Sequence, residues 1–304
     1  MNRRAFLKWQ MRGLLWLAAA PVLGPGTARA TALPDVAVAK GAPAAATRAA
    51  VELLGGMSRF VRPGQKVLIK PNMSFARGPE SGSTTHPEVL RTVLVMCKEA
   101  GASRIRVLDH SLQNAEQSLL RSGILDVCEG VEPGICHHLM ESGLYVEADL
   151  DQGLEMRTNA FMPDALEADV IIAVPVAKSH GSTGVSLALK GQMGLIWDRR
   201  AMHSRYNLDA SIVDLNTRVK PHLAVIDATR VLTTGGPGGP GEVITPGEVI
   251  ASADPVAADA TAVASYPWYG RMLQAKQVRH ILLAHERGLG RMDIENLVTL
   301  RITV

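Results

Sequence analysis

The sequence predicts an α/β protein with an open, mostly parallel, Rossmann-like sheet, helices on both faces and a small inserted subregion. Two observations support this prediction. Short apolar segments alternate with longer segments whose apolar residues recur at helical spacing, which is typical of βαβ units. In addition, residues 170–176 are all apolar, as expected for a strand that is buried on both faces of a parallel sheet.

The predicted elements follow this alternation along most of the chain. In the first half we expect strands at 36–40, 66–70 and 104–108, and helices at 44–57, 87–100 and 114–122. The pattern weakens at 133–164, where we expect an insertion with a small antiparallel subsheet and a strand at 144–150. The second half is predicted to contain strands at 170–176, 222–226, 248–252 and 298–304, and helices that start at Thr183 and cover 208–219, 255–265 and 271–287.

Turn and cap residues support several of these boundaries. Thr85 or His86 would cap the helix that starts at Pro87, because proline is favoured at the first helical position. Asp254 followed by Pro255 has the same form, so we expect Asp254 to be an N-cap and not a site residue.

Residues 1–30 are predicted to be a twin-arginine signal peptide, and residues 31–304 a single domain. Arg3-Arg4 precedes an apolar run that is shorter than the roughly 20 residues of a membrane-spanning helix. The small-residue sequence Ala28-Arg29-Ala30 follows and resembles a cleavage site. We therefore expect cleavage after Ala30 and a periplasmic protein delivered by the twin-arginine translocase. A retained membrane anchor is the alternative.

The charge of the predicted mature chain differs from that of the precursor. Residues 1–30 hold five basic residues and no acidic residue, so their removal changes the formal net charge from +3 to −2. The remaining chain has no basic run and keeps two of the four tryptophans. This composition gives no support for nucleic-acid binding, and no nucleic-acid partner is expected.

The three cysteines limit the cofactors that this chain can hold. Cys97, Cys128 and Cys136 form no C-x-x-C motif, so the chain alone is not expected to bind a four-cysteine iron–sulfur cluster. Cys97 falls on the apolar face of a predicted helix and is expected in the core. Cys128 and Cys136 could pair in an oxidising periplasm.

Ionisable residues follow four of the predicted strands and mark the expected site. They are Lys70, Asp109 with His110, Lys178 with His180, and Asp227. Parallel strands share one carboxyl edge, where open α/β sheets bind ligands, so we expect these residues to converge. The alternative is that each is a solvated loop residue.

The residue types in this group suggest an anionic ligand, such as a phosphate or a carboxylate. Lys70, Lys178 and Lys190 would supply positive charge, and the N–H groups at the start of the helix predicted at Thr183 would add donors. Ser179 and Thr183 are small enough for close backbone approach to a ligand. There is no G-x-x-x-x-G-K-[ST] motif, so the segment is not a P-loop. Lys190 could instead extend into solvent.

Histidines provide candidate acid and base groups. His86, His110 and His180 would titrate near neutral pH, and Asp109 or Asp227 could orient one of them. The same residues could hold a metal ion, although no H-E-x-x-H spacing is present. His203 is expected on the surface. The glycine- and proline-rich segment 235–241 could be a ligand-covering loop or a plain connection.

Several motifs in the chain resemble those of the domain of unknown function 362 family, and the resemblance covers most of the mature chain. They are Lys70-Pro71-Asn72, Thr84-Thr85-His86-Pro87-Glu88-Val89, Asp109-His110-Ser111, Lys178-Ser179-His180, Thr183-Gly184-Val185, Leu187-Ala188-Leu189-Lys190, Asp227 with the glycine-rich segment, and Asp254-Pro255-Val256-Ala257-Ala258-Asp259.

The resemblance implies that Asn72, Thr85 and Ser111 join the ligand-binding residues. This chain has Leu108-Asp109-His110-Ser111 where the family often has Gly-Asp-Ser, which leaves the role of His110 open, and it has Gly191 where asparagine often follows the second lysine. Family members are sometimes joined to ferredoxin-like modules. The sequence has no such cysteine module, so any iron–sulfur link would come from a partner chain.

Two functions from different classes are expected from these features. The first is an exported enzyme that grips a small anion with Lys70, Lys178 and Lys190 and moves a proton with His180 or His86, with Asp109 and Asp227 orienting. The second is a non-catalytic protein that carries a metal, a cofactor or an iron–sulfur redox partner through the twin-arginine route. A structural protein with a degenerate site is a third interpretation. Neither a substrate nor a cofactor is identified by the sequence.

Overall fold

Eleven strands form one mixed sheet in residues 33–304, the part of the chain that the computed structural model describes. Eight of them lie in the order β15-β1-β12-β10-β7-β2-β3-β4, while β8 and β11 pair with β10, and β9 pairs with β8. Neighbours from β10 through β7, β2 and β3 to β4 run parallel, whereas β12 is antiparallel to both β1 and β10. The strands of this sheet are β1 (Val36–Lys40), β2 (Lys66–Pro71), β3 (Arg104–Asp109), β4 (Cys136–His138), β7 (Val170–Val174), β8 (Val176–His180), β9 (Gly184–Ser186), β10 (Leu223–Leu232), β11 (Val243–Ile244), β12 (Glu248–Ser252) and β15 (Thr299–Thr303).

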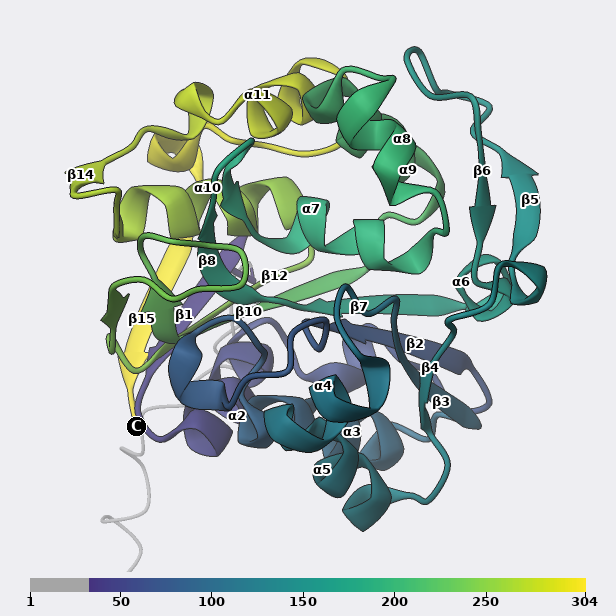
Figure 1. The fold of residues 1–304 in the computed structure, drawn as a ribbon. Coiled ribbons are helices and arrows are strands. Elements are labelled where there is room, and N and C mark those ends of the chain that lie inside the picture. The colour runs from purple at the N-terminus through teal and green to yellow at the C-terminus, as the bar shows by residue number, and fades with distance from the viewer. Residues whose placement is uncertain (1–32) are drawn as a thin grey trace, which may run out of the picture. The chain divides into compact units, whose positions relative to one another are not determined.

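Helices cover both faces of this sheet (Figure 1). One face carries α2 (Pro43–Leu53), α3 (Pro87–Glu99), α4 (Ala115–Ser122) and α5 (Ile124–Val131). The opposite face carries α7 (Ala188–Gly191), α8 (Arg199–Ser204), α9 (Leu208–Arg218), α10 (Pro255–Ser265) and α11 (Arg279–Glu286), and α6 (Pro163–Glu167) lies near β7. Short 3-10 helices occur at Met57–Arg59, Pro79–Ser81, Ser142–Leu144, Gln192–Leu195 (η4), Ala275–Gln277 and Ile294–Asn296.

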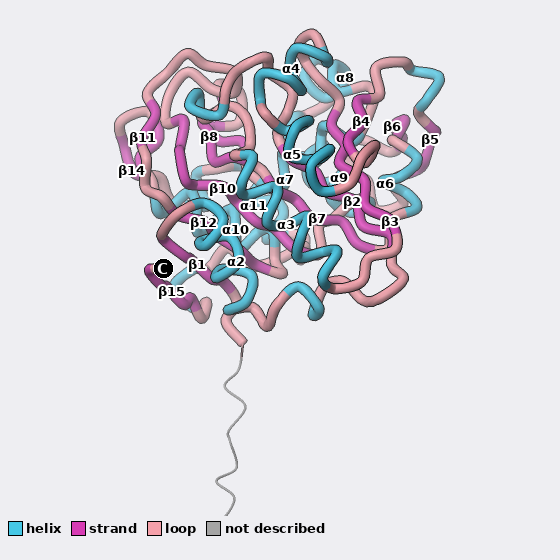
Figure 2. The backbone as a smooth tube through the Cα atoms, turned by 90° about the horizontal axis from the view of Figure 1, so that it is seen from below, coloured by secondary structure: helices cyan, strands magenta, loops and turns pink. Residues whose placement is uncertain are grey.

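Each face of the sheet has its own hydrophobic core. The central strand β7 is buried at all five positions, because alternate side chains point into the two helical layers. Val170, Ile172 and Val174 pack with the α2–α3 side, and Ile171 and Ala173 with the α9–α10 side. The tube view in Figure 2 shows the C-terminus beside β15 and β1, at one end of the sheet.

The predicted α/β fold class is confirmed by this arrangement, including the small subregion. Within the predicted insertion, β5 (Val146–Asp149) and β6 (Thr158–Phe161) form a separate antiparallel pair that stands to one side of the layered body (Figure 1). The helix caps are confirmed as well. His86 caps α3 by accepting from the Glu88 N–H, and Asp254 caps α10 by accepting from the Val256 and Ala257 N–H groups.

The helix predicted from Thr183 is wrong, because this segment forms a β-hairpin. Pro175 separates β7 from β8, and β8 turns back into β9 with His180 opposite Gly184. Gly184 has a positive φ of 75°, which glycine adopts without a steric penalty. Gly181, Thr183 and Val185 are also weak helix formers. The helix of this region, α7, begins only at Ala188.

Three further boundaries differ from prediction, and the first is the helix predicted over residues 44–57, which ends at Leu53. Strand β10 continues past Asp227 to Leu232, so Asp227 lies within a strand and not at its end. The helix predicted over residues 271–287 begins only at Arg279, because Arg271–Met272 (β14) pairs with Pro267–Trp268 (β13) across a turn at Tyr269 and Gly270. Both of these turn residues have positive φ, which a helix does not accommodate.

The three cysteines are free and buried thiols, so the disulfide considered for Cys128 and Cys136 is not formed. A hydrogen bond between Cys128 and Cys136, together with burial, raises the pKa of the Cys128 thiol. The predicted signal peptide lies outside the described residues, so its cleavage and the export route stay predictions. None of the helices formed by residues 33–304 has the length and apolar character needed to span a membrane.

Candidate functional site

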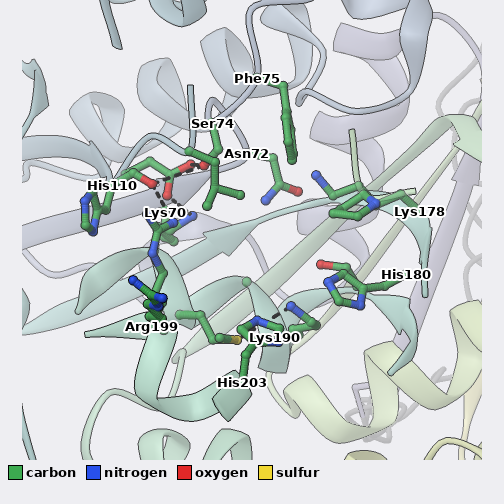
Figure 3. A pocket seen from close by; sticks show the side chains of 18 of the residues that line it. Lys70, Asn72, Ser74, Phe75, His110, Lys178, His180, Lys190, Arg199 and His203 are labelled. Carbon is green, nitrogen blue, oxygen red and sulfur yellow. Dashed lines mark hydrogen bonds and ion pairs between the residues drawn. The ribbon is translucent and has the colours of Figure 1, made fainter. Parts of the chain in front are cut away.

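A pocket of about 370 Å³ lies where β2, β3 and β8 meet η4 and α8 (Figure 3). Figure 3 shows Lys178 and His180 on one side of it and Lys70, His110 and Arg199 on the other. Its polar and charged lining residues are Lys70, Asn72, Ser74, Asp109, His110, Lys178, His180, Ser186, Lys190, Arg199, Arg200 and His203.

The β8–β9 hairpin aims two of the predicted site residues into this pocket. Alternate residues of a strand point to the same side, so Lys178 and His180 both line the pocket while Ser179 between them does not. The Ser179 hydroxyl instead accepts a hydrogen bond from the Gly236 N–H at 3.0 Å. The hairpin therefore provides a lysine and a histidine on one face, and its other face anchors the glycine-rich loop.

Lys70 and Asp109 form a buried ion pair at the base of the pocket. Their Nζ and Oδ1 atoms are 3.0 Å apart, and both side chains are at most 2% exposed. The second oxygen of Asp109 accepts from the Met73 N–H at 3.1 Å and from the Ser74 hydroxyl at 2.8 Å. Burial lowers the pKa of Lys70, and the Asp109 charge opposes that effect. The parallel pairing of β2 with β3 brings these two residues together.

Gly194 in η4 packs directly on this ion pair. A Cβ atom at this position would overlap with Asp109 Oδ1 and Lys70 Cε and would lie 2.9 Å from Lys70 Nζ. We expect Gly194→Ala to lower the free energy of unfolding by about 1–3 kcal/mol, the usual cost of overpacking, in a urea denaturation. Gly181→Ala is the matched control, because a Cβ there meets nothing within 4 Å. Equal stability of the two variants would contradict the tight packing.

Lys190 is positioned by a buried carboxylate on α10. Asp259 accepts hydrogen bonds from the Ala188 and Leu189 N–H groups, at 2.8 and 3.0 Å, at the start of α7. Burial raises the pKa of Asp259 to about 7. Lys190 follows in this short helix, and the one hydrogen bond that its amine makes within residues 33–304 goes to the Met193 sulfur at 3.6 Å. Asp259 thus gives a structural reason for the last residue of the Asp254–Asp259 motif.

The pocket carries an excess of positive charge. Five lysine and arginine side chains line it, and Asp109 is the single carboxylate among its lining residues. Lys178 and Lys190 form no ion pair within residues 33–304. Burial lowers the pKa of Lys178 to about 7 and that of Lys190 to about 8, and neighbouring cations contribute. Such buried cations without counter-charges favour an anionic ligand.

Two histidines of the pocket present opposite hydrogen-bonding character. His180 Nδ1 accepts from the Ser182 N–H at 3.2 Å, so the neutral ring carries its proton on Nε2. Burial, followed by the charge of Lys190, lowers the pKa of His180 to about 3. His110 Nδ1 lies 3.1 Å from the Ile196 carbonyl oxygen, which assigns the proton to Nδ1 and a lone pair to Nε2. His180 can donate to a ligand, and His110 can accept.

Apolar and aromatic groups complete the walls. Trp197 stacks on His110 with ring centroids 5.0 Å apart and an interplanar angle of 9°. Phe75 lies under the Lys178 amine, which is 5.2 Å from the ring centre. Pro237 lines the pocket, so the glycine-rich loop forms part of its wall. A Cβ on Gly238 would come within 2.8 Å of the Phe75 ring, which accounts for glycine at that position.

Seven of the thirteen predicted site residues meet in this pocket: Lys70, Asn72, Asp109, His110, Lys178, His180 and Lys190. Asn72 also fixes the start of β8, because its side-chain oxygen accepts from the Val176 N–H at 3.0 Å.

The other six predicted residues do not line the pocket and make structural contacts instead. Asp227, predicted to orient a histidine, accepts from the His86 N–H at 2.7 Å and from Thr229. Together with His86, which was predicted to transfer a proton, it joins β10 to the start of α3. Thr85 donates to the Val174 carbonyl oxygen, and Thr183 to that of Val185 in the hairpin turn. The hydroxyls of Ser111 and Ser179 contact the Met73 carbonyl oxygen and the Gly236 N–H.

Sequence reasoning missed several lining residues, above all Ser74, Trp197, Arg199 and Arg200. Arg199 donates to the carbonyl oxygens of His110 and Ser111, at 2.7 and 3.3 Å, and thus joins α8 to the end of β3. His203, which we expected on the surface, is exposed but lies at the pocket, with its ring 6.2 Å from that of His180. A signal was present in the sequence, since Trp197, Arg199, Arg200 and His203 lie within the seven-residue stretch 197–203, shortly after the lysine-containing motif that ends at Lys190.

Metal binding was an open alternative for the same residues. Within residues 33–304, no three histidine, cysteine or acidic side chains are grouped closely enough to hold a metal ion.

Comparisons with known proteins are consistent with the motifs found in the sequence. The chain is 28% identical over 224 residues to the thylakoid-associated protein sll1697 of Synechocystis sp., which covers 71% of this chain and 67% of that protein. A solved structure, the lactate racemase apoprotein from Thermoanaerobacterium thermosaccharolyticum, aligns with a TM-score of 0.45 and 12% identity. That alignment covers 72% of this chain and 54% of the racemase chain, so the chain spans about half the length of that protein. A family model described as domain of unknown function (DUF362) matches residues 67–264, and the chain therefore belongs to this family.

Proposed function

We propose that this protein is an enzyme that binds a small anionic molecule, a phosphate or a carboxylate, in the pocket between β8 and α8. The observation that carries the proposal is the pair of buried lysines, Lys178 and Lys190, which have no counter-ion within residues 33–304. An ordinary fold avoids such groups, because an unpaired buried charge is destabilising. A ligand with negative charge would supply the missing partner.

The geometry supports different roles for the residues than the sequence suggested. Lys190 and Arg199 would hold the anion, since neither faces a carboxylate at ion-pair distance within residues 33–304. His180 would donate a hydrogen bond from Nε2, because Nδ1 already accepts from Ser182. Proton transfer near neutral pH would fall to Lys178, whose pKa is about 7, or to His110 through Nε2. His86, which does not reach the pocket, has no role in this proposal.

The test is a binding titration with inorganic phosphate and malonate as probes, measured by calorimetry and by tryptophan fluorescence, to which Trp197 in the pocket wall contributes. At pH 6.5, where Lys190 with a pKa of about 8 is protonated, we expect the wild-type protein to bind at least one probe. Lys190→Met should weaken that binding by about 30-fold or more, as expected for the loss of a desolvated charge partner. Lys98→Met is the matched control, because Lys98 is exposed on α3 and pairs with Glu132.

If Lys190→Met and Lys98→Met weakened binding equally, the change in net charge would explain the effect, and this would contradict a specific site. Failure of the wild-type protein to bind any phosphate or carboxylate probe would overturn the proposal itself. A ferredoxin-like partner and a carrier role stay predictions from the sequence. Recovery of a cysteine-rich redox protein with the precursor would favour that second function.

A further inference from the structure

Lys178 differs from the other two pocket lysines in what surrounds its amine. Its side chain is 2% exposed, and its Nζ donates one hydrogen bond within residues 33–304, to the Ser83 carbonyl oxygen at 2.7 Å. Lys70, in contrast, is held by Asp109 at 3.0 Å and by the Pro71 carbonyl oxygen at 2.6 Å. The amine of Lys178 is therefore freer to form a new bond than that of Lys70, which is already held by a carboxylate and a carbonyl oxygen.

The surroundings also favour the uncharged form of this amine. Burial is the main cause of the lowered pKa of Lys178, and the charges of Lys70 and Lys190 add to it against the opposing effect of Asp109. With a pKa of about 7, close to half of the amine is neutral and nucleophilic at neutral pH. Lys190, with a pKa of about 8, stays mainly protonated under the same conditions and is better suited to hold an anion.

We propose that Lys178 forms an imine with a carboxylate that also bears a carbonyl group, a molecule of the 2-oxo acid class. This inference rests on the proposed function, because Lys190 and Arg199 would hold the carboxylate of the same molecule. His180 follows Lys178 on the same face of β8 and presents its Nε2–H for the carbonyl oxygen. Phe75 and Trp197 give the apolar walls that such a small molecule would contact.

The reaction balances without an oxidant or a reductant. The neutral Lys178 amine adds to the carbonyl carbon, a C–N bond forms, and one proton moves from nitrogen to the former carbonyl oxygen to give a carbinolamine. The C–O bond then breaks, and the oxygen leaves as water with a second proton, which a neighbouring acid such as the Lys190 ammonium supplies. Loss of the remaining N–H proton restores that acid, so that one amine and one carbonyl compound give one imine and one water.

The test is to trap this imine. The purified full-length protein is mixed with pyruvate as the probe and with sodium borohydride, and the product is measured by intact mass and by peptide mapping. The expected product carries one pyruvate, less water and plus two hydrogens, on Lys178. The rate of labelling should rise with pH around 7, whereas a surface lysine reacts only as the pH approaches its ordinary pKa near 10.

Variants and competitors separate this inference from the proposed function. Lys178→Arg keeps the positive charge and cannot form the imine, so labelling should fall by at least about tenfold. Malonate has no ketone and should protect Lys178 from label. If that variant does not fold, protection of the wild-type protein by malonate remains the test. Lys98→Met should be labelled on Lys178 like the wild type.

Each outcome has a distinct meaning. Malonate or phosphate binding with no pyruvate adduct on Lys178 would overturn the imine and leave the anion site intact. Labelling spread over surface lysines, without protection by malonate, would also overturn it. An adduct on Lys178 in a protein that binds neither malonate nor phosphate would support the nucleophile and contradict the anion site.

Discussion

Asp109→Asn is expected to lower the free energy of unfolding by about 3–5 kcal/mol, because it removes one partner of a buried ion pair. Lys70 would then lie without a counter-charge in a place where both side chains are at most 2% exposed, with neutral oxygens such as the Pro71 carbonyl to accept from it. The substitution also weakens two bonds that order the segment after β2, those from the Met73 N–H and the Ser74 hydroxyl. Urea denaturation measures the loss.

Glu167→Gln is the matched control for this prediction. Glu167 pairs with Lys66 at 3.7 Å, and the side chains are 58% and 50% exposed, so that the expected loss is below about 1 kcal/mol. A loss for Asp109→Asn as small as that of the control would mean that Lys70 and Asp109 do not form a desolvated pair in solution.

Lys178→Met, in contrast to Asp109→Asn, is expected to raise the free energy of unfolding at pH 6 and thus to stabilise the protein. The pKa of Lys178 is lowered from 10.5 to about 7 in the folded state, mainly by burial. The folded state therefore binds fewer protons than the unfolded state between pH 7 and 10.5, and wild-type stability rises with pH in this range. At pH 6 the burial of the charged lysine costs about 5 kcal/mol, from about 1.36 kcal/mol for each pKa unit. Loss of the bond to the Ser83 carbonyl oxygen offsets about 1 kcal/mol, so a gain of about 3–4 kcal/mol is expected.

The measurement is the difference in unfolding free energy between variant and wild type at pH 6 and at pH 9. The gain should shrink as the pH rises, because the wild-type protein recovers stability through deprotonation of Lys178. Lys66→Met, at an exposed position, should show no such pH dependence. A destabilised Lys178→Met at pH 6 would show that the lysine has a structural role, and would remove the argument that it is kept for a ligand.

These two predictions together describe how the pocket differs from the core. Lys70 is neutralised by the chain itself, whereas Lys178 and Lys190 are buried without a counter-charge within residues 33–304. Proteins retain such destabilising groups at functional sites, where strain and activity go together. The contrast of sign between Asp109→Asn and Lys178→Met is thus a direct test of which charges serve the fold and which serve a ligand.

The local pattern of residues was enough to predict most of the layered fold. Val36–Lys40, Glu248–Ser252 and Pro255–Ser265 have the predicted boundaries, because apolar periodicity and the proline–aspartate cap act over a few residues. The wrong secondary-structure predictions lie in segments where a tight turn sets the direction of the chain. Gly184 and Tyr269 have positive φ and lie in hairpins where helices were predicted. The residue type at one position does not show with which strand the neighbouring segment will pair.

From the sequence by itself, Lys70, Asp109, Lys178 and His180 could be predicted to lie near one sheet edge, since parallel strands end together, and all four line the pocket, whereas Asp227 from the same prediction does not. Only the tertiary structure decided that Asp109 neutralises Lys70 and not Lys178, that Asp227 and His86 hold β10 to α3, and that Arg199 completes the pocket. The physical reason is the separation in sequence over which the interactions act. Strand and helix periodicity are set by neighbours in the chain, whereas burial and ion pairing depend on atoms that are close in space and distant in sequence.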